Sequence, residues 1–412
     1  MPTLSQSKPA LRTGAPRAAA EPAPLSRTRF LDIAAPSRPF RFRDGGALES
    51  LTLAYETHGT LSPQRDNAIL LFHALSGSHH TAGHDPVGPA NRFWTAECHE
   101  GWWDDFIGPG RALDTSRYFV ICANYPGGCY GSTGPSSIDP ESGEPYGSRF
   151  PALAVEDIVD ANARLLDELG IDALHAVVGA SLGGCCAVDF ALRHSRRAQL
   201  VVPIATGLRA TSLAKAHNLE QILAIESDPE FRGGDYYGGP GPERGLALAR
   251  MISHKTFVSL SLMERRARGE IVEAGDRLAR YRLRHPIESY LLHQGKKFTP
   301  RFDANTYLRI LDAWQSWDVP SRAGCGGLPA LFAPCAHQSW LLFSISSDVC
   351  FYPEEQAEIA SALRSAGVPH EHITVNSEKG HDSFLLEPSL YAPYLGYKLR
   401  SAPLFADHGD GI

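Results

Sequence analysis

The sequence predicts an α/β fold, in which a mostly parallel β-sheet is flanked by helices and interrupted by a helical cap or lid insertion. Two observations support this class. Short β-rich runs alternate with longer helical stretches toward both ends of the chain, and a long middle segment carries no strong strand signal. Several β-rich runs are continuously apolar, as expected of strands covered on both faces. The length of 412 residues fits one large domain with an inserted cap.

Seven candidate strands follow one another along the chain. They cover residues 51–56, 68–72, 118–123, 175–179, 200–204, 340–345 and 372–375. Between Pro151 and Gly170 the apolar residues recur at helical spacing, so a helix is expected between the third and fourth strands. Because strands alternate with helices, the sheet should be mostly parallel.

The alternation stops near Thr206, and the chain is then largely helical and charged until about residue 320. We therefore expect a first part of the core at 29–205, a helical cap at 206–325 and a second part of the core at 326–412. Residues 1–28 hold five prolines and a single acid, Glu21, and are expected to form a disordered tail. They carry no apolar stretch typical of a secretory signal.

Composition narrows the classes of function. With 43% hydrophobic and 21% charged residues, the chain has the composition of an ordinary globular protein. The absence of a long apolar run predicts no membrane span, and the net charge of -7 argues against nucleic acid as a partner. Eight cysteines occur without a C-x-x-C pair, which predicts reduced thiols, no metal site and a cytoplasmic location.

One motif points to nucleophilic catalysis. Gly179-Ala-Ser181-Leu-Gly183 is a G-x-S-x-G sequence that directly follows a strand-like run and directly precedes a helical pattern. Strand, sharp turn and helix are the context of the nucleophile elbow of the α/β-hydrolase fold, in which side chains at the two glycines would crowd the turn. The alternative is an ordinary strand-to-helix turn with a capping serine.

A serine hydroxyl needs a base and an orienting acid to become a good nucleophile. In this fold the chain order is Ser, then Asp or Glu, then His. Asp348 comes just after the strand at 340–345, and His381 follows the strand at 372–375. Both therefore belong to the sheet edge at which α/β sites assemble. We predict the catalytic triad Ser181, Asp348 and His381, although with 17 histidines in the chain a surface role for His381 is the alternative.

The oxyanion hole should combine two backbone N–H groups. One belongs to the residue after the nucleophile, Leu182. The second is expected at Leu75, in the segment 72–77 that follows an apolar strand. A plain glycine-containing turn is the alternative for that segment.

With these motifs the chain resembles the homoserine O-acyltransferases of the MetX type. The matching segments are 73–77, 101–110, 124–137, 179–184, 245–254, 288–290, 294–295, 301–307, 347–348 and 380–384. The resemblance implies an α/β-hydrolase core with a helical cap. It also implies acyl transfer from acyl-CoA to the hydroxyl of homoserine in methionine biosynthesis, with Ser181 acylated, His381 as base and Asp348 as its partner. Acetyl-CoA is the first expectation for the co-substrate and succinyl-CoA the second, with no cofactor bound.

Two positions depart from the family. Cys185-Cys186 replaces its usual Met-Gln pair, one turn from the nucleophile. Ile222 occupies the position at which we expect the arginine that holds the amino acid's carboxylate. Arg209 is therefore predicted to bind the substrate instead, with Lys255 as a second candidate. A serine O-acyltransferase of cysteine biosynthesis, using acetyl or succinyl groups, stays open. So does a serine hydrolase of esters or thioesters.

The expected partners are small molecules, an amino acid and acyl-CoA, rather than nucleic acid or a membrane. The resemblance also allows a homodimer formed through the cap.

Overall fold

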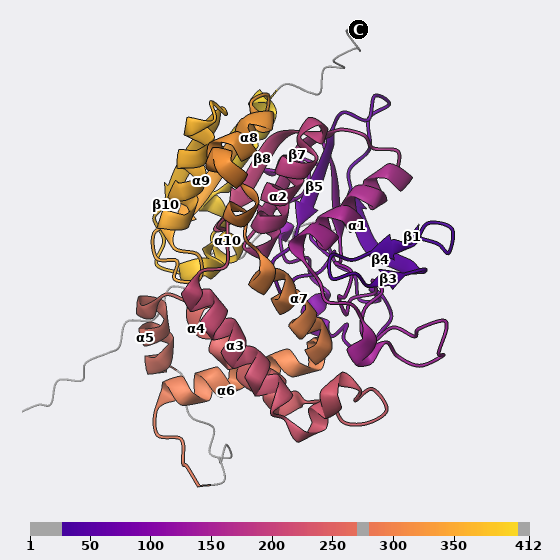
Figure 1. Ribbon diagram of the computed structural model, residues 1–412. Helices are drawn as coiled ribbons and strands as arrows, with labels where there is room; N and C mark the ends of the chain where they lie inside the picture. The colour runs from indigo at the N-terminus through magenta and orange to yellow at the C-terminus, as the bar shows by residue number, and fades with distance from the viewer. Residues whose placement is uncertain (1–26, 270–279, 403–412) are drawn as a thin grey trace, which may run out of the picture.

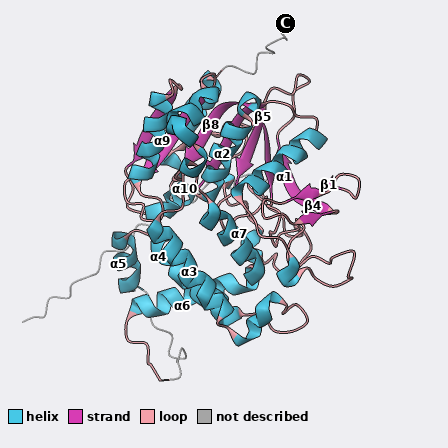
Figure 2. Ribbon diagram, viewed as in Figure 1, coloured by secondary structure: helices cyan, strands magenta, loops and turns pink. Residues whose placement is uncertain are grey.

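The computed structural model describes residues 27–269 and 280–402. Its centre is an eight-stranded sheet with helices on both faces (Figures 1 and 2). In spatial order the strands are β1 (Arg29–Ala34), β4 (Leu51–His58), β6 (Phe119–Ala123), β5 (Ala68–Phe72), β7 (Leu174–Ala180), β8 (Ala198–Ile204), β9 (Ser339–Ile345) and β10 (His370–Val375). The short strands β2 (Phe40–Arg41) and β3 (Ala47–Leu48) form a separate hairpin. The predicted α/β fold class is confirmed.

The sheet is parallel from β6 to β10, whereas β4 pairs antiparallel with β6 and β1 antiparallel with β4. All seven predicted strands are present. The strand β1, an edge strand of which half the residues are exposed, was not predicted. Such an edge strand carries little of the apolar signal on which sequence analysis depends.

Two apolar layers cover the sheet. On β5 the side chains alternate, so that Leu70 and Phe72 enter one layer and Ile69 and Leu71 the other. Helices α1 (Val155–Glu168), α2 (Leu182–Arg193) and α9 (Pro353–Ser365) contribute to the first layer. Helices α10 (Ser383–Leu386) and α11 (Ala392–Ser401) contribute to the second. The short α8 (Gly327–Phe332) precedes β9.

Between β8 and α8, the described part of the chain is a set of α-helices joined by loops and short 3-10 turns (Figure 2). It consists of α3 (Ser212–Glu226), α4 (Glu243–Phe257), α5 (Leu260–Gly269), α6 (Pro286–Phe298) and α7 (Ala304–Ser316). Two glycines let these helices approach closely. A Cβ at Gly245 would lie 2.6 Å from the carbonyl oxygen of Ala224, and one at Gly295 would lie 2.8 Å from that of Ala247. We refer to these five helices as the cap.

The predicted N-terminal tail lies outside the described residues except for Arg27 and Thr28. Thr28 is anchored to the core, because its N–H donates to Asp85 and its hydroxyl contacts His79. Thr28, the last residue of the predicted tail, therefore contacts the core. All eight cysteines are free thiols. Among the described helices, none combines the length and the apolar character that crossing a membrane requires.

Candidate active site

Ser181 occupies a strained turn between β7 and α2. Its backbone has φ 58° and ψ -126°, a region that residues other than glycine rarely adopt. The flanking glycines are sterically required. A Cβ at Gly179 would lie 2.0 Å from the carbonyl oxygen of Gly183, and a Cβ at Gly183 would lie 2.3 Å from that of Phe72. The N-terminus of α2 begins directly after Ser181, so its free N–H groups favour negative charge beside the hydroxyl.

Asp348 and His381, which are 33 residues apart in the chain, form a buried pair. The Nδ1 atom of His381 lies 2.7 Å from Oδ2 of Asp348. The other carboxylate oxygen of Asp348 accepts hydrogen bonds from the N–H groups of Cys350 and Phe351, at 2.8 and 3.0 Å. Because this carboxylate is fixed as an acceptor, it selects the His381 tautomer with hydrogen on Nδ1. The Nε2 atom is left to accept a proton, and it has no protein partner among the described residues.

The surroundings of His381 make it a stronger base. Burial alone acts to lower its pKa, but the charge and hydrogen bond of Asp348 and the charges of Asp382 and Glu355 outweigh burial. The net effect raises the pKa of His381 above its ordinary value of 6.5. The ring also packs against the aromatic rings of Phe257 and Phe351, with centroids 6.1 and 5.6 Å away.

A cavity of about 260 Å³ brings these groups together. Ser181, His381, Leu75 and Leu182 all line it. Within the described part of the chain, the N–H groups of Leu75 and Leu182 donate to no protein acceptor. The cavity thus brings together a serine hydroxyl, an imidazole whose Nε2 can accept a proton and two free backbone donors, an arrangement that could carry out acyl transfer through a covalent intermediate. Asp348 orients the imidazole of His381 through the contact with Nδ1.

Arg209 does not line this cavity. Its Nη2 atom lies 2.6 and 2.7 Å from the two carboxylate oxygens of Glu358 on α9, and the side chain is partly exposed there. The chain turns away after β8, and Arg209 pairs with Asp318 through a backbone bridge. The prediction that Arg209 binds substrate is therefore corrected. Lys255, the second candidate for the carboxylate contact, is exposed to solvent. Ile222 is partly buried and packs against the first apolar layer.

One of the two arginines that do line the cavity is Arg250, on α4. Its guanidinium lies over the rings of Phe257 and Phe298, 5.1 and 4.8 Å from their centroids. The Nε and Nη1 atoms are buried and find no hydrogen-bond partner among the described residues. Burial lowers the pKa of Arg250. An arginine in this state is suited to bind a carboxylate that enters the cavity. Sequence analysis missed it, although the matching segment 245–254 contains it.

Four further acidic or arginine side chains line the cavity: Asp382, Arg301, Glu97 and Glu100. The carboxyl of Asp382 follows His381 directly, and burial raises its pKa. Arg301 donates to the hydroxyl of Tyr130 at 3.1 Å and points toward the carbonyl of Ser76 at 3.4 Å. Glu97 lies 3.8 Å from Arg301, so this second arginine, unlike Arg250, has protein partners.

Cys185 and Cys186 lie in the first turn of α2 and outside the cavity lining. The thiol of Cys185 contacts the hydroxyl of Thr206 at 3.1 Å, and burial raises its pKa to about 12. A buried thiol with so high a pKa is a packing group rather than a nucleophile. No cluster of side chains suited to a metal ion occurs among the residues that the structure describes.

The chain matches the α/β-hydrolase fold family over residues 67–388. It is 42% identical over 354 residues to a homoserine O-succinyltransferase of Methylibium petroleiphilum, covering 86% of this chain and 89% of the relative. It is 40% identical over 361 residues to a homoserine O-acetyltransferase of Solidesulfovibrio magneticus, covering 87% and 88%.

Two solved structures are similar over nearly their whole length. A homoserine O-acetyltransferase from Bacillus anthracis superposes with a TM-score of 0.79 at 25% identity, covering 92% of this chain and 100% of that one. Esterase E22 superposes with the same TM-score of 0.79 at 25% identity, covering 91% and 100%. Transferases and a hydrolase thus share this architecture.

Proposed function

The chain belongs to the homoserine O-acyltransferases of the α/β-hydrolase fold, and from that membership we propose that it transfers an acyl group from acyl-CoA to the hydroxyl of homoserine. One observation carries the choice of an amino-acid acceptor. The Nε and Nη1 atoms of Arg250 are buried and have no hydrogen-bond partner among the described residues, and Arg250 lines the cavity that also holds Ser181 and His381. An α-carboxylate would accept hydrogen bonds from these N–H groups and bring the opposite charge, which a neutral ester lacks.

The reaction proceeds in two halves. The Oγ of Ser181 attacks the thioester carbonyl while Nε2 of His381 takes its proton, and CoA leaves as the protonated thiol. The N–H groups of Leu75 and Leu182 stabilise the oxyanion of the tetrahedral intermediate. The hydroxyl of homoserine then attacks acyl-Ser181, with His381 again as base, and releases the O-acyl amino acid and free Ser181.

Arg250 and Asp382 orient the acceptor in this proposal. The guanidinium of Arg250 binds the α-carboxylate with charge-assisted hydrogen bonds. The carboxyl of Asp382, which lines the same cavity, faces the α-ammonium group. Two opposite charges in one small cavity distinguish a zwitterionic amino acid from a neutral alcohol.

The acyl group is the open choice within this proposal. Acetyl transfer was the first expectation, but a succinyltransferase and an acetyltransferase are 42% and 40% identical to the chain. Similarity therefore does not favour one donor. A place in methionine biosynthesis and a cytoplasmic location stay predictions that follow from the proposed reaction.

The deciding experiment measures CoA release from acetyl-CoA and from succinyl-CoA with homoserine, with serine and without an acceptor. We expect release to depend on homoserine, with one donor preferred. Intact-protein mass after mixing with the preferred donor alone should show one acyl group, which Ser181→Ala abolishes together with about 10⁴-fold or more of kcat. Equal CoA release in all three conditions would identify a hydrolase, which the similarity to esterase E22 makes the second candidate. Faster release with serine would retain acyl transfer but change the acceptor.

A further inference from the structure

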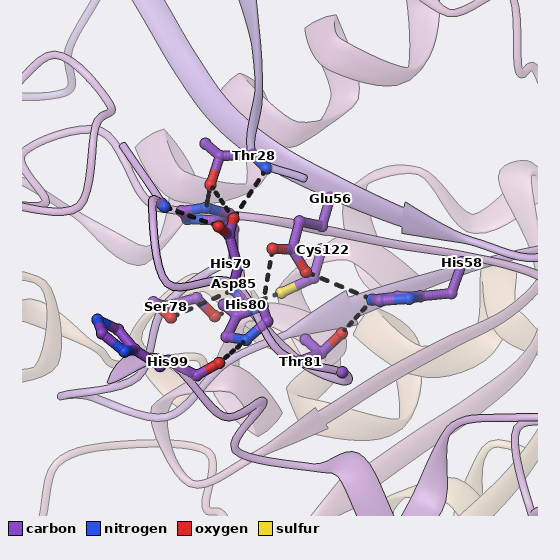
Figure 3. Close-up of polar contacts among 12 residues, drawn as sticks. Thr28, Glu56, His58, Ser78, His79, His80, Thr81, Asp85, His99 and Cys122 are labelled. Carbon is purple, nitrogen blue, oxygen red and sulfur yellow. Dashed lines mark hydrogen bonds and ion pairs between the residues drawn. The ribbon is translucent and has the colours of Figure 1, made fainter. Parts of the chain in front are cut away.

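The segment 73–81, which carries Leu75 and is called the oxyanion loop below, contributes Ser78, His79, His80 and Thr81 to a largely buried polar cluster (Figure 3). The central residue of this cluster is Glu56 on β4. It is 0% exposed, so bulk water does not solvate its carboxylate. Further along the loop, His80 lies against this carboxylate on one side and lines the substrate cavity on the other. Neither residue belongs to the triad. A buried carboxylate destabilises the folded protein unless it is paired with a positive charge and hydrogen-bonded.

The geometry fixes the protons of His80. Its Nδ1 atom lies 2.8 Å from Oε1 of Glu56, and its Nε2 atom lies 2.9 Å from the carbonyl oxygen of His99. A carbonyl can only accept, so Nε2 carries hydrogen. The Nδ1 atom faces a carboxylate and carries hydrogen as well. The ring is then an imidazolium, and the pair consists of one positive and one negative charge.

The neighbouring groups are consistent with this assignment. Burial acts to raise the pKa of Glu56, but the hydrogen bonds of His58 and His80 and the charges of His79 and His80 lower it to about 2. Burial acts to lower the pKa of His80, but Glu56 raises it, helped by the His99 carbonyl and the charge of Asp85. Both shifts therefore favour the charged forms.

The adjacent His79 behaves oppositely. It is buried, and burial together with the charge of His80 lowers its pKa to about 4, against the opposing charges of Glu56 and Asp85. Its Nε2 atom lies 2.8 Å from the hydroxyl of Thr28. His79 is therefore neutral near pH 7, and His80 is the cation that lies within hydrogen-bond distance of Glu56. The remaining histidine, His58, lies with Nε2 3.4 Å from Oε2 of Glu56.

His80 joins three separate parts of the core. Through Glu56 it is tied to β4, through its own backbone to the oxyanion loop, and through the His99 carbonyl to the segment 96–103. A second cross-link is parallel to it, because the indole N–H of Trp102 donates to the carbonyl of Ser78 at 2.9 Å. The segment 96–103 supplies one wall of the cavity through Glu97, Cys98, Glu100 and Trp102.

We propose that Glu56 and His80 are positioning residues. Their buried ion pair holds the oxyanion loop in the position from which the backbone N–H of Leu75 can stabilise the tetrahedral intermediate. The inference rests on the proposed function only in assuming that Ser181 is acylated. Catalytic geometry is sensitive at this scale, because a misplacement of about 1 Å can cost about 100-fold in rate. The pair keeps the loop in place without touching the reacting atoms.

The test replaces both partners by apolar residues, Glu56→Leu/His80→Phe. Exchanging a buried ion pair for apolar groups of similar volume often preserves stability, so the variant should fold while losing the link to His99. We expect acylation of Ser181 by p-nitrophenyl acetate to slow by about 10- to 100-fold. A trifluoromethyl ketone, which forms a tetrahedral adduct with Ser181, should lose affinity by the same factor. The KM for homoserine should stay within about threefold, since Arg250 is untouched.

Two further variants separate positioning from a merely structural role. In Glu56→Gln the amide can donate to Nδ1 of a neutral His80, which preserves the link, so acylation should stay within about threefold of native. His84→Gln is the matched control, because His84 forms an exposed pair with Glu100 in the same region, at 2.6 Å with 43% of the His84 side chain exposed. It should leave acylation unchanged.

The inference is overturned if the folded double variant keeps native acylation and native affinity for the ketone. It is also overturned if acylation falls while the ketone binds as before, because the oxyanion site would then be intact. Because p-nitrophenyl acetate needs no amino-acid acceptor, a failure of homoserine-dependent CoA release would count against the proposed function alone and leave this comparison valid.

Discussion

Arg250 and Arg209 differ in the partner that each guanidinium has. Arg209 is held by both oxygens of Glu358, whereas Nε and Nη1 of Arg250 are buried without a partner among the described residues. We predict that Arg250→Gln raises the acceptor KM by about 10- to 100-fold, because a charge-assisted hydrogen bond contributes about 1.5–3 kcal/mol. Acylation by the donor alone, measured by stopped flow, should change much less. Arg209→Gln is the control, and an equal rise in KM for that variant would contradict the assignment.

The raised pKa of His381 sets the lower pH limit of activity. The base must be neutral to take the proton of Ser181, so kcat/KM should fall as the pH drops through a midpoint above the ordinary 6.5. Removing a charge that raises this pKa should move the midpoint to lower pH. We predict this shift for Glu355→Gln, since Glu355, whose own pKa burial raises to about 7, is charged at and above neutral pH and there raises the pKa of His381.

The control for this pH profile is Glu354→Gln, on the neighbouring and exposed position. It should leave the midpoint where it is in the native chain. Glu355 also accepts a hydrogen bond from the N–H of Tyr352, which the glutamine oxygen can still accept, so the start of α9 is preserved. A midpoint that moves to higher pH in Glu355→Gln would contradict the electrostatic account.

At the scale of elements, α2 has two features of interest. Its N-terminus favours negative charge beside the Ser181 hydroxyl, and its first residues include the pair Cys185-Cys186. Both thiols are 0% exposed and lie outside the cavity lining. We predict that Cys185→Met/Cys186→Gln keeps kcat within about tenfold but lowers the free energy of unfolding by about 1–3 kcal/mol, because larger side chains overpack a filled core. Chemical denaturation and steady-state kinetics on one preparation separate the two effects. Cys325→Met, at an exposed position, is the control, and loss of turnover in a folded α2 variant would show that the thiols do more than pack.

The individual elements also show which parts of the fold and the site could be predicted from the sequence. Strands β5 to β9 are buried on both faces, so their continuous apolar runs were visible, and the glycines of the elbow are required sterically. The exposed edge strand β1 offered no such run. Arg250 was missed because a charged residue within a helix normally faces solvent, and only the packing of α4 turns it into the cavity. Arg209 was misplaced because position after a strand does not determine which way the chain then turns.

At the scale of the whole molecule, the cavity is assembled from two parts that are separate in sequence. The core supplies Ser181 and His381, and the cap supplies Arg250, Phe257 and Trp314. Because the cap closes over the nucleophile, water around an acyl-enzyme is restricted, which favours transfer over hydrolysis. Esterase E22 superposes over 91% of this chain, so the overall architecture alone does not determine which of the two reactions occurs.

The outer surface of the cap leads to the last prediction, that two copies of the chain associate through it. Leu219 and Leu223 lie one turn apart on α3 and are each 52% exposed, and Leu248 on α4 is 47% exposed. Exposed apolar residues that gather on packed helices are often covered by a partner. In an interface with two-fold symmetry both chains carry every substitution. Leu219→Glu/Leu223→Glu would therefore place like charges on both sides of it.

We therefore predict a dimer in the native chain and a monomer in Leu219→Glu/Leu223→Glu, measured by sedimentation velocity across a range of concentrations. Val87→Glu, which charges an apolar residue that is 69% exposed on the core, should leave the dimer intact. The cap also forms the roof of the cavity, so its loss of support in the monomer should raise the share of CoA released without acceptor. A native chain that sediments as a monomer, or a cap variant that stays dimeric, would rule out this surface and leave the acyl-transfer chemistry to a single chain.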